Sequence, residues 1–370
     1  MNTQTAYSTW VEIDLGAIEN NIRQIVHLTS TQVMAVVKAN AYGHGAVPVA
    51  RAALRAGATW CGVARIEEAL ELRRGGLDCP ILLLGYTPPQ RLDEAIIEGI
   101  SLTVWNAEQV EQASQAATRS GRTAHLHLKV DTGMSRLGVQ VAGAPALAKQ
   151  LATTPGIVLE GVFTHFAKAD ESDPSTTDNQ EARFQSVLHS LQANGVQPTI
   201  VHAANSAASL TRSSACFDML RAGIAIYGLH PSSECPLPDS FRPALSWKSV
   251  LSMVKVLPPG RGLSYGHEYF TRGNEHIGTI PVGYADGFRR TQGNQVLVGG
   301  QLAPIVGRVC MDQVLVQLDR VPQAHEGDQV VLIGEQDGQR LSAEQVAKSW
   351  GTINYEVVCG IGPRVPRIYI

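Results

Sequence analysis

The chain has 370 residues, of which 44% are hydrophobic and 17% are charged, and its formal net charge at pH 7 is −3. A chain of this length and composition can bury one large core or two separate ones. The small net charge, with no run of like charges, argues against nucleic acids and anionic membranes as partners.

The start of the chain and the cysteines indicate where the protein works. The segment MNTQTAYSTWVEIDL has no apolar stretch behind a basic one, and no apolar run approaches the ~18 residues that a membrane span needs. Six cysteines are scattered through the chain without a C-x-x-C pair, at positions 61, 79, 216, 235, 310 and 359. This pattern is typical of reduced thiols. The sequence therefore predicts a cytoplasmic protein with no disulfide framework and no zinc site.

Between residues 30 and 228 a short β-rich apolar run followed by a helical pattern recurs. The runs lie at 33–39, 60–64, 80–85, 100–105, 124–130, 158–166, 198–204 and 217–220. Amphipathic segments lie between them at 47–58, 66–76, 88–99, 107–121 and 179–195, and another helix is expected at 15–28. Eight strands alternating with helices predict an α/β fold with an N-terminal (β/α)8 TIM-like barrel. A doubly wound open sheet is an alternative that periodicity alone does not exclude.

The sequence pattern changes after residue 229, where the alternation of strands and helices ends. Residues 229–243 contain four prolines and are typical of a domain boundary. Short β-runs separated by Gly and Pro turns follow at 251–257, 276–284, 295–299, 312–318 and 328–334. One helix is expected at 342–350. The prediction is a barrel at 11–240 followed by a β-rich C-terminal domain at 241–370. The alternating N-terminal segment STWVEIDL is a candidate strand of that second domain, which residues 1–10 would then join.

Polar residues follow the ends of the predicted strands. Lys38 ends the first run, Arg136 follows the fifth, His165 ends the sixth, Asn205 and Ser206 follow the seventh, and Arg221 and Gly223 follow the eighth. In a barrel, the carboxyl ends of the strands carry the active site. A serine hydroxyl and a glycine after the last two strands suit a phosphate group, which needs donors and close backbone approach.

Lys38 stands in the stretch AVVKANAYGHG, at the end of a strongly apolar run. Desolvation lowers the pKa of a lysine, and a neutral amine can form an imine with an aldehyde. Pyridoxal 5'-phosphate supplies both an aldehyde and a phosphate. Each of these residues alone has an ordinary structural role, such as a lysine that reaches solvent or a serine that caps a helix. Their common position on one rim favours a cofactor site.

Nine segments carry a resemblance to a known family. They are AVVKANAYGHG, KVDTGMSRLG, FTHFAKAD, HAANSAA, MLRAGIAIYGL, GLSYGHEY, VGYADGF, GRVCMDQ and INYEVVCGIGPRVPRIY. In this order, from about residue 10 to the C-terminus, they resemble the alanine racemases, which are fold type III enzymes dependent on pyridoxal phosphate. The resemblance implies a barrel plus a β-domain and a head-to-tail homodimer, in which Tyr265 and Met311 reach the partner's site.

The resemblance also implies two catalytic bases. Racemisation removes a proton from one side of the α-carbon and returns it to the other, so two groups should flank the cofactor. Lys38 resembles the base that acts on D-alanine, and Tyr265 the base that acts on L-alanine. His165 and Arg221 are candidates to supply positive charge beside Tyr265, and Arg221 resembles the residue that contacts the pyridine nitrogen.

The remaining site residues are assigned in the same way. The set implied to bind the cofactor, besides Lys38 and Arg221, is Tyr42, Arg136, Asn205, Ser206, Gly223, Ile224 and Tyr355. Arg136 and the backbone N–H of Met311 resemble the groups that hold the substrate carboxylate, which a forked guanidinium suits. Lys129 resembles a lysine that some members carbamylate. Tyr265 and Tyr355 would narrow the entrance and favour a methyl side chain.

The expected activity is interconversion of L- and D-alanine, for cell-wall precursors or for alanine catabolism. A serine racemase or one of broader specificity would share nearly every motif. A carrier of pyridoxal phosphate without catalysis would lack the second domain, and the related decarboxylases use a glycine triplet that this chain does not have. His125, His127 and Lys129 on one strand face resemble part of an amidohydrolase metal site, but no further ligand set accompanies them.

Overall fold

The computed structural model describes residues 6–370. It divides into two compact units, one of residues Gly16–Arg242 and one of Pro243–Ile370 together with residues 6–15. Within residues 6–370, no helix has both the length and the apolar character needed to cross a membrane.

The first unit is a nearly closed barrel of parallel strands. Its eight strands within residues 16–242 are β2 (Gln32–Val36), β3 (Trp60–Val63), β4 (Ile81–Leu83), β5 (Ile100–Val104), β6 (Ala124–Asp131), β8 (Ile157–Phe163), β9 (Ile200–His202) and β10 (Met219–Ala222). They pair in the order β10-β2-β3-β4-β5-β6-β8-β9, and the short β7 (Val139–Gln140) is attached to β6. At the seam between β9 and β10, the Asp218 and Arg221 N–H groups donate to Val201 O at 3.1 Å and Ala204 O at 3.0 Å.

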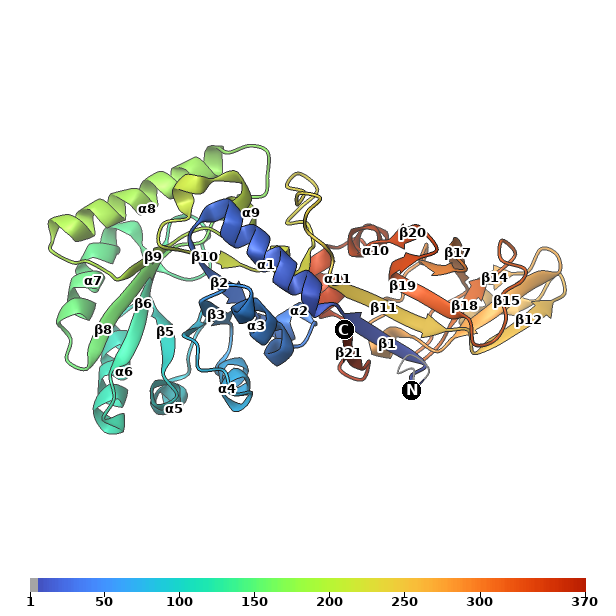
Figure 1. The fold of residues 1–370 in the computed structure, drawn as a ribbon, viewed down its shortest axis with the longest axis horizontal. Helices are drawn as coiled ribbons and strands as arrows, with labels where there is room; N and C mark the ends of the chain where they lie inside the picture. Colours follow the sequence, from blue (N-terminus) through green and yellow to red (C-terminus); the bar gives the residue numbers. More distant parts are fainter. Residues whose placement is uncertain (1–5) are drawn as a thin grey trace. The chain divides into compact units, whose positions relative to one another are not determined.

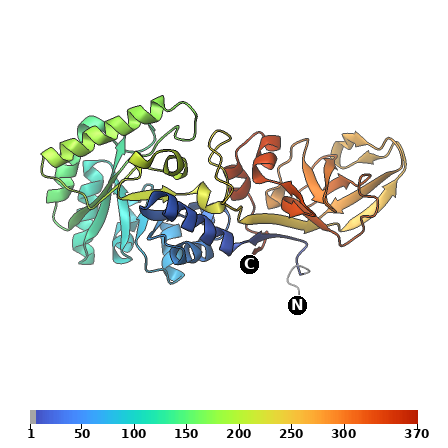
Figure 2. The same ribbon diagram turned by 45° about the horizontal axis from the view of Figure 1, so that its top comes forward.

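Helices cover the outside of this ring of strands (Figures 1 and 2). They are α1 (Leu15–Thr29), α3 (Ala46–Arg55), α4 (Ile66–Arg74), α5 (Leu92–Ile97), α6 (Ala107–Ser120), α7 (Ala144–Thr153), α8 (Ser175–Ala193) and α9 (Ser206–Thr211). Helix α6 shows how the sequence sets their limits. Asn106 Oδ1 accepts the Gln109 N–H at 2.9 Å before its first turn, and Gly121 ends it with φ of 64°. Strands β3 and β5 are buried along their whole length, as expected when helices cover a parallel sheet.

The predicted barrel class is confirmed, but three details of the predicted rim are corrected. Strand β2 ends at Val36, so Lys38 lies two residues beyond it, and His165 likewise lies two residues beyond β8. Arg221 lies within β10 rather than after it. Helix α7 was not predicted, because its sequence APALAKQLAT is rich in alanine and gives little contrast between polar and apolar positions.

The second unit is β-rich, as expected. Its main sheet has the order β12-β15-β18-β17-β16-β19-β11-β1-β21. These strands are β12 (Met253–Leu257), β15 (Glu275–Ile280), β18 (Val314–Gln317), β17 (Gln301–Val306), β16 (Gln295–Val298), β19 (Gln329–Gln336), β11 (Leu245–Val250), β1 (Thr9–Ile13) and β21 (Arg367–Tyr369). The N-terminal strand β1 pairs antiparallel with β11 and parallel with β21.

Smaller elements complete this unit. The short strand β20 (Gln339–Leu341) pairs with β19, and β13 (Gly262–Leu263) pairs with β14 (Tyr269–Phe270). Two helices, α10 (Ala343–Trp350) and α11 (Asn354–Cys359), precede the last strand. Ser342 caps α10 by accepting the Gln345 N–H at 3.2 Å, which explains why the predicted helix begins there.

Candidate active site

The backbone turns left-handed directly after Lys38. Residues Ala39, Asn40, Ala41 and Tyr42 all have φ of 52° or 53°, and the Gly43 N–H closes the turn on Ala39 O at 3.0 Å. An L-residue in this conformation costs about 1–2 kcal/mol, and it is rare for several to follow one another. The surrounding contacts must therefore offset several kcal/mol of backbone strain, which is often concentrated at functional sites.

The residues of the stretch ANAYGHG supply those contacts. Asn40 Oδ1 accepts the Ala46 N–H at 2.9 Å, which ties the turn to the start of α3. Nδ1 of the fully buried His44 lies 2.9 Å from Tyr42 O and 3.1 Å from Ala41 O. Because a carbonyl oxygen only accepts, this nitrogen is the donor. The motif after Lys38 is thus a rigid support that fixes where Lys38 and Tyr42 leave the backbone.

Tyr42, Ser206 and Gly223 come together at the ends of β10 and β9. Ser206 Oγ accepts the N–H groups of Gly223 at 2.9 Å and of Ala225 at 3.3 Å. A Cβ at residue 223 would lie 2.7 Å from the Tyr42 hydroxyl. The absence of a side chain at Gly223 therefore lets the Tyr42 hydroxyl approach the backbone close to Ser206 Oγ. Two hydroxyl groups beside a glycine backbone are groups that suit a phosphate. Ile224, which is buried, begins the 3₁₀ turn Ile224–Tyr227 that follows Gly223.

Asn205 has a local structural role. It precedes α9, and its Oδ1 accepts the Ala208 N–H at 3.0 Å, so it caps this helix. The cap holds the adjacent Ser206 at the first position of α9. Asn205 therefore affects the contact between Ser206 and Gly223 by placing Ser206.

Arg221 is buried beneath this rim and has several acceptors. Its Nη2 donates to Thr164 O at 2.7 Å and to Ala203 O at 2.8 Å and lies 3.2 Å from His165 Nδ1. Its Nη1 lies 2.9 Å from His202 Nδ1. Burial lowers the pKa of Arg221 to about 9, so the guanidinium is charged at neutral pH.

Positive charges gather around His165 and Lys129. Burial, followed by the charges of Arg221, Arg136 and Lys38, lowers the pKa of Lys129 to about 7. Burial and then Arg221 bring the pKa of His165 well below its usual value, with smaller effects from the other three cations. His165 is therefore neutral at pH 7. The predicted residues Lys38, Arg136 and Arg221 therefore lie within electrostatic reach of both Lys129 and His165. Such a concentration of cations favours an anionic ligand.

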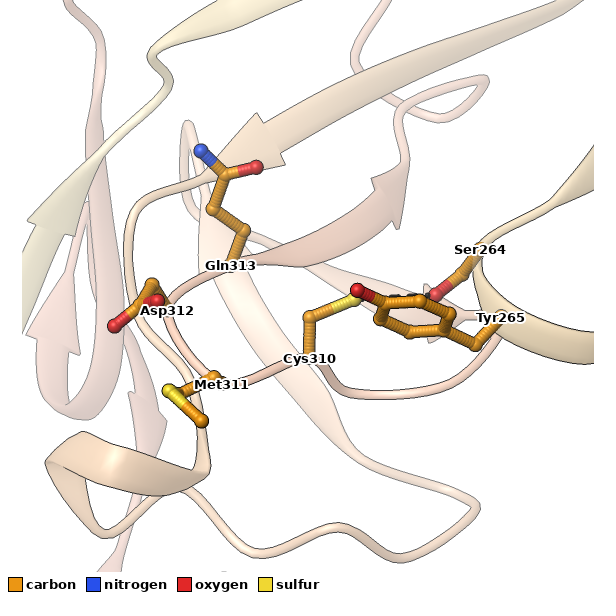
Figure 3. Close-up of a pocket in the computed structure, with 6 residues that line it drawn as sticks. All are labelled: Ser264, Tyr265, Cys310, Met311, Asp312 and Gln313. Atoms are coloured by element: carbon orange, nitrogen blue, oxygen red, sulfur yellow. Dashed lines mark hydrogen bonds between the residues drawn. The ribbon is translucent and has the colours of Figure 1, made fainter.

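The second unit brings Tyr265 and Met311 together at one open pocket of about 420 Å³. Tyr265 is 69% exposed and Met311 is 53% exposed. Figure 3 shows the Tyr265 ring on one side of the pocket and the loop from Cys310 to Gln313 on the other. The pocket lies in the β-rich unit, far along the chain from the barrel residues.

Glycine and serine contacts hold this pocket in shape. Ser264, with φ of 60°, donates from Oγ to Arg308 O at 2.6 Å and so fixes the residue before Tyr265. On the other side, a Cβ at Gly283 would lie 2.2 Å from Met311 O, and that oxygen accepts the Ala285 N–H at 3.1 Å. The backbone of Met311 is therefore held against the turn that follows β15.

Tyr355 also lies in the β-rich unit, on helix α11, where it is half-buried. The alternative metal reading of His125, His127 and Lys129 does not match their contacts. His127 lies against Glu160 and His202, whereas Lys129 Nζ lies over the Phe163 ring at 5.1 Å from its centroid. Among residues 6–370 there is no group of three or more His, Cys, Asp or Glu side chains placed to hold a metal ion.

Two features of the site escaped the sequence analysis. The left-handed turn was missed, although Gly43 and Gly45 so close to Lys38 are a signal of unusual backbone. The contact of Glu160 with His127 was missed for a different reason. His127 pairs with Gly161 on the neighbouring strand, and in a regular strand the side chain of Glu160 would point to the opposite face of the sheet from residue 161.

Comparisons with known proteins match both units of the chain. The family model "Alanine racemase, N-terminal domain" matches residues 13–231, and "Alanine racemase, C-terminal domain" matches residues 244–369. An alanine racemase from Desulfovibrio desulfuricans is 47% identical over 365 residues, which cover 98% of both chains. One from Geobacillus kaustophilus is 48% identical over 367 residues, covering 98% of this chain and 94% of that protein.

Solved structures give the same result. The alanine racemase of Clostridium difficile superposes with a TM-score of 0.94 at 40% identity, covering 99% of this chain and 96% of the other. The alanine racemase of Bacillus anthracis with bound L-Ala-P has a TM-score of 0.92 at 44% identity, with 98% and 95% covered. Since both family models match in order and the relatives align along nearly their whole length, the chain belongs to the alanine racemase family.

Proposed function

We propose that this enzyme interconverts L- and D-alanine with pyridoxal phosphate bound at the barrel rim, and that Lys38 and Tyr265 are its two bases. Membership of the racemase family supports the reaction. The single observation that carries the cofactor assignment is the close approach of the Tyr42 hydroxyl to the backbone of Gly223, which a Cβ at residue 223 would prevent. A phosphate fits there because Ser206 and Tyr42 offer hydroxyl groups and Gly223 permits close backbone approach.

The cofactor would be held at three points. Tyr42, Ser206, Gly223 and Ile224 would bind the phosphate, and Tyr355 completes that set by resemblance to the family. Lys38 would form the covalent attachment to the aldehyde carbon. When bound, the cofactor supplies an aldehyde for the amino group of the substrate and a conjugated ring that withdraws electrons from its α-carbon.

Arg221 would face the ring nitrogen. The hydrogen bonds found for its guanidinium within residues 6–370 use Nη1 and Nη2, which makes Nε–H the group that we assign to this contact. Because arginine does not readily give up its proton, the ring nitrogen would stay unprotonated and the ring would remain a weak electron acceptor. An unprotonated ring nitrogen would favour return of a proton to the α-carbon over side reactions such as transamination.

Proton transfer would use one group on each face of the substrate. The Lys38 amine would accept the α-proton of D-alanine, and the Tyr265 hydroxyl of a second chain would donate a proton to the opposite face to give L-alanine. In the reverse direction the two groups would exchange these roles. Arg136 and the Met311 N–H would bind the substrate carboxylate, since a guanidinium and a backbone donor both match its oxygens.

The proposed assembly is a homodimer with shared active sites. Tyr265, Met311 and Tyr284 are exposed, the last at 45%, and the Tyr284 N–H donates to Cys310 O at 3.1 Å in the same loop contact. Exposed aromatic and apolar side chains concentrated on one face are typical of an interface. We propose that this face covers the Lys38 rim of a partner, and that the product serves cell-wall precursors or alanine catabolism.

An absorption spectrum combined with alanine exchange in D₂O tests the proposal. The purified protein with added pyridoxal phosphate should show a band near ~420 nm, as lysine-bound cofactor does, and should incorporate deuterium at Cα of either enantiomer. Lys38→Ala should lose both properties, whereas Lys149→Ala, an exposed lysine on α7, should keep both. A Lys38→Ala protein that retains the band and the exchange would refute the assignment.

A further inference from the structure

A line of buried hydrogen bonds leads from Arg221 to a carboxylate inside the barrel. Arg221 Nη1 lies 2.9 Å from His202 Nδ1, and His202 Nε2 lies 2.9 Å from His127 Nδ1. His127 Nε2 then lies 3.1 Å from Glu160 Oε2, which also accepts the Ser101 hydroxyl at 2.5 Å. Both imidazole rings are fully buried.

The Arg221 guanidinium, which can only donate, determines which nitrogen of each histidine carries the proton. Arginine can only donate, so Nδ1 of His202 accepts. Burial pushes the pKa of His202 well below its usual value, so the ring is neutral and its proton lies on Nε2. That proton is donated to Nδ1 of His127, whose own pKa is also lowered by burial. His127 therefore carries its proton on Nε2 and donates it to Glu160.

The line has no place for an additional proton. A proton on Nδ1 of His127 would force both nitrogens of His202 to accept, and an imidazole with two accepting nitrogens is an imidazolate. At the far end, burial raises the pKa of Glu160, but hydrogen bonds from His127 and Ser101 outweigh this effect and the pKa is lowered. Glu160 is therefore an anion, and it is joined to the Arg221 cation through two neutral rings.

The backbone is shaped to make the contact between Glu160 and His127. The pairing of β6 with β8 is regular up to Leu126 and Leu159, and then His127 pairs with Gly161, so Glu160 is the extra residue of a β-bulge. A bulge redirects a side chain that regular alternation would send elsewhere. At the next position, a Cβ at Gly161 would lie 2.2 Å from His127 Nδ1, so the glycine makes room for the ring.

We propose that Glu160 and His127 are positioning residues for Arg221. Through the fixed tautomers of His127 and His202, the carboxylate holds the guanidinium in one orientation and offsets its buried charge. The effect on catalysis rests on the proposed function, in which Arg221 faces the cofactor ring. The tautomers themselves are a property of this chain and do not depend on that function.

Nitrogen NMR tests the tautomers directly. Long-range ¹H–¹⁵N spectra are recorded on the full-length protein with ¹⁵N-labelled histidine, and spectra of His127→Gln and His202→Gln assign the signals. The rings of His127 and His202 should both be neutral. Both should carry the proton on Nε2 and neither should titrate between about pH 6 and 9. A proton on Nδ1 of either ring, or titration of either ring in that range, would overturn the proposal.

Kinetics of matched glutamate variants test the positioning role. Glu160→Gln keeps an acceptor for His127 and removes the charge, and it should lower kcat for alanine about tenfold with KM within about twofold. Glu181→Gln is the control, because Glu181 is also a buried carboxylate but pairs with Arg212 at 3.1 Å. It should leave both constants within about twofold.

A milder variant guards against misfolding. Ser101→Ala removes one donor to Glu160 and should lower kcat by a smaller factor in the same direction, again without raising KM. Glu160→Gln and Glu181→Gln proteins with the same kcat would overturn the positioning role. A wild-type protein that does not racemise alanine would instead refute the proposed function, and the NMR experiment would still decide the tautomers.

Discussion

The Tyr42 hydroxyl occupies the space that a side chain at Gly223 would need. A Cβ there would lie 2.7 Å from this oxygen, closer than nonbonded contacts allow. Gly223→Ala should therefore push the Tyr42 hydroxyl away from the proposed phosphate site, so we expect the dissociation constant for pyridoxal phosphate to rise at least about tenfold, or ~1.4 kcal/mol. Titration of the protein with the cofactor, followed by absorbance, measures this constant.

The control for this prediction is Gly273→Ala. No heavy atom lies within 4 Å of a Cβ built at residue 273, so this variant should bind the cofactor as the wild type does. Equal affinities for the Gly223→Ala and wild-type proteins would show that Tyr42 and Gly223 do not hold the phosphate.

Much of this site could be predicted because its residues follow the strand–helix alternation. The hydrophobic runs place Ser206 and Gly223 after neighbouring strands, and the resemblance to the family then assigns their roles. Arg221 was predicted to follow the eighth strand because the apolar run FDML ends at residue 220. In the structure β10 continues to Ala222, so Arg221 lies within the strand. A charged residue normally ends an apolar run, and here buried acceptors keep the arginine inside the strand.

Other parts depend on contacts between residues distant in sequence. The bulge at Glu160 and the orientation of His127 arise from pairing between β6 and β8, which no local pattern encodes. The left-handed turn after Lys38 is stabilised by Asn40 and by His44, yet alanine at 39 and 41 gives no sign of positive φ. Such features require the tertiary structure, because local propensity argues against them.

The left-handed turn predicts an unusual response to glycine. Ala39 has φ of 53°, which glycine adopts without the penalty of a Cβ. Ala39→Gly should therefore raise the free energy of unfolding in urea, by up to about 1 kcal/mol. Ala152→Gly, at an exposed site in the last turn of helix α7, should instead lower it, by less than the ~1 kcal/mol that glycine costs in a helix interior. A loss of stability in both variants would contradict the presence of strain at Ala39.

Replacing Arg221 should change the products of the reaction. A carboxylate at this position could share a proton with the ring nitrogen and make the ring a stronger electron acceptor, so Arg221→Glu should form more pyruvate by transamination. Coupling to lactate dehydrogenase measures pyruvate. Arg212→Gln, which changes an ion pair of Arg212 with Asp178 and Glu181, should leave the ratio of products unchanged. An unchanged ratio in Arg221→Glu as well would argue against the assigned contact.

Lys129 should react with carbon dioxide in a pH-dependent manner. Only the neutral amine attacks carbon dioxide, giving a carbamate and releasing a proton. Burial and the nearby cations lower the pKa of Lys129 to about 7, so the fraction of neutral amine, and with it the carbamate, should increase from pH 6 to pH 8. A carbamate would also turn a charge that repels Arg136 into one that attracts it.

Carbon NMR with ¹³C-bicarbonate detects this group without acid treatment. A protein-bound carbamate signal should grow over that pH range in the wild type and in Lys149→Ala, and it should be absent from Lys129→Ala. A signal that persists in Lys129→Ala would place the carbamate on another lysine.

The thiols of Cys61, within β3, and Cys79, two residues before β4, should differ in reactivity. The Sγ atoms of Cys79 and Cys61 lie 3.7 Å apart. In the protonated pair the Cys79 thiol donates to Cys61 Sγ. When Cys79 ionises, Cys61 becomes the donor to its thiolate, which lowers the pKa of Cys79 against the effect of burial, whereas the same contact and burial raise the pKa of Cys61. Because the thiolate is the nucleophile, iodoacetamide at limiting concentration should modify Cys79 before Cys61, and peptide mass spectrometry should show the order.

Cys61→Ser separates the two causes of this difference. A serine hydroxyl is a harder and stronger donor than a thiol, so it should keep or strengthen the hydrogen bond to the Cys79 thiolate and preserve its rate of alkylation. Cys61→Ala removes the donor and should slow alkylation of Cys79. Cys359, which is exposed, provides the reference rate in each protein. If Cys79 reacts equally fast in Cys61→Ala and in the wild type, exposure rather than the contact with Cys61 controls its reactivity.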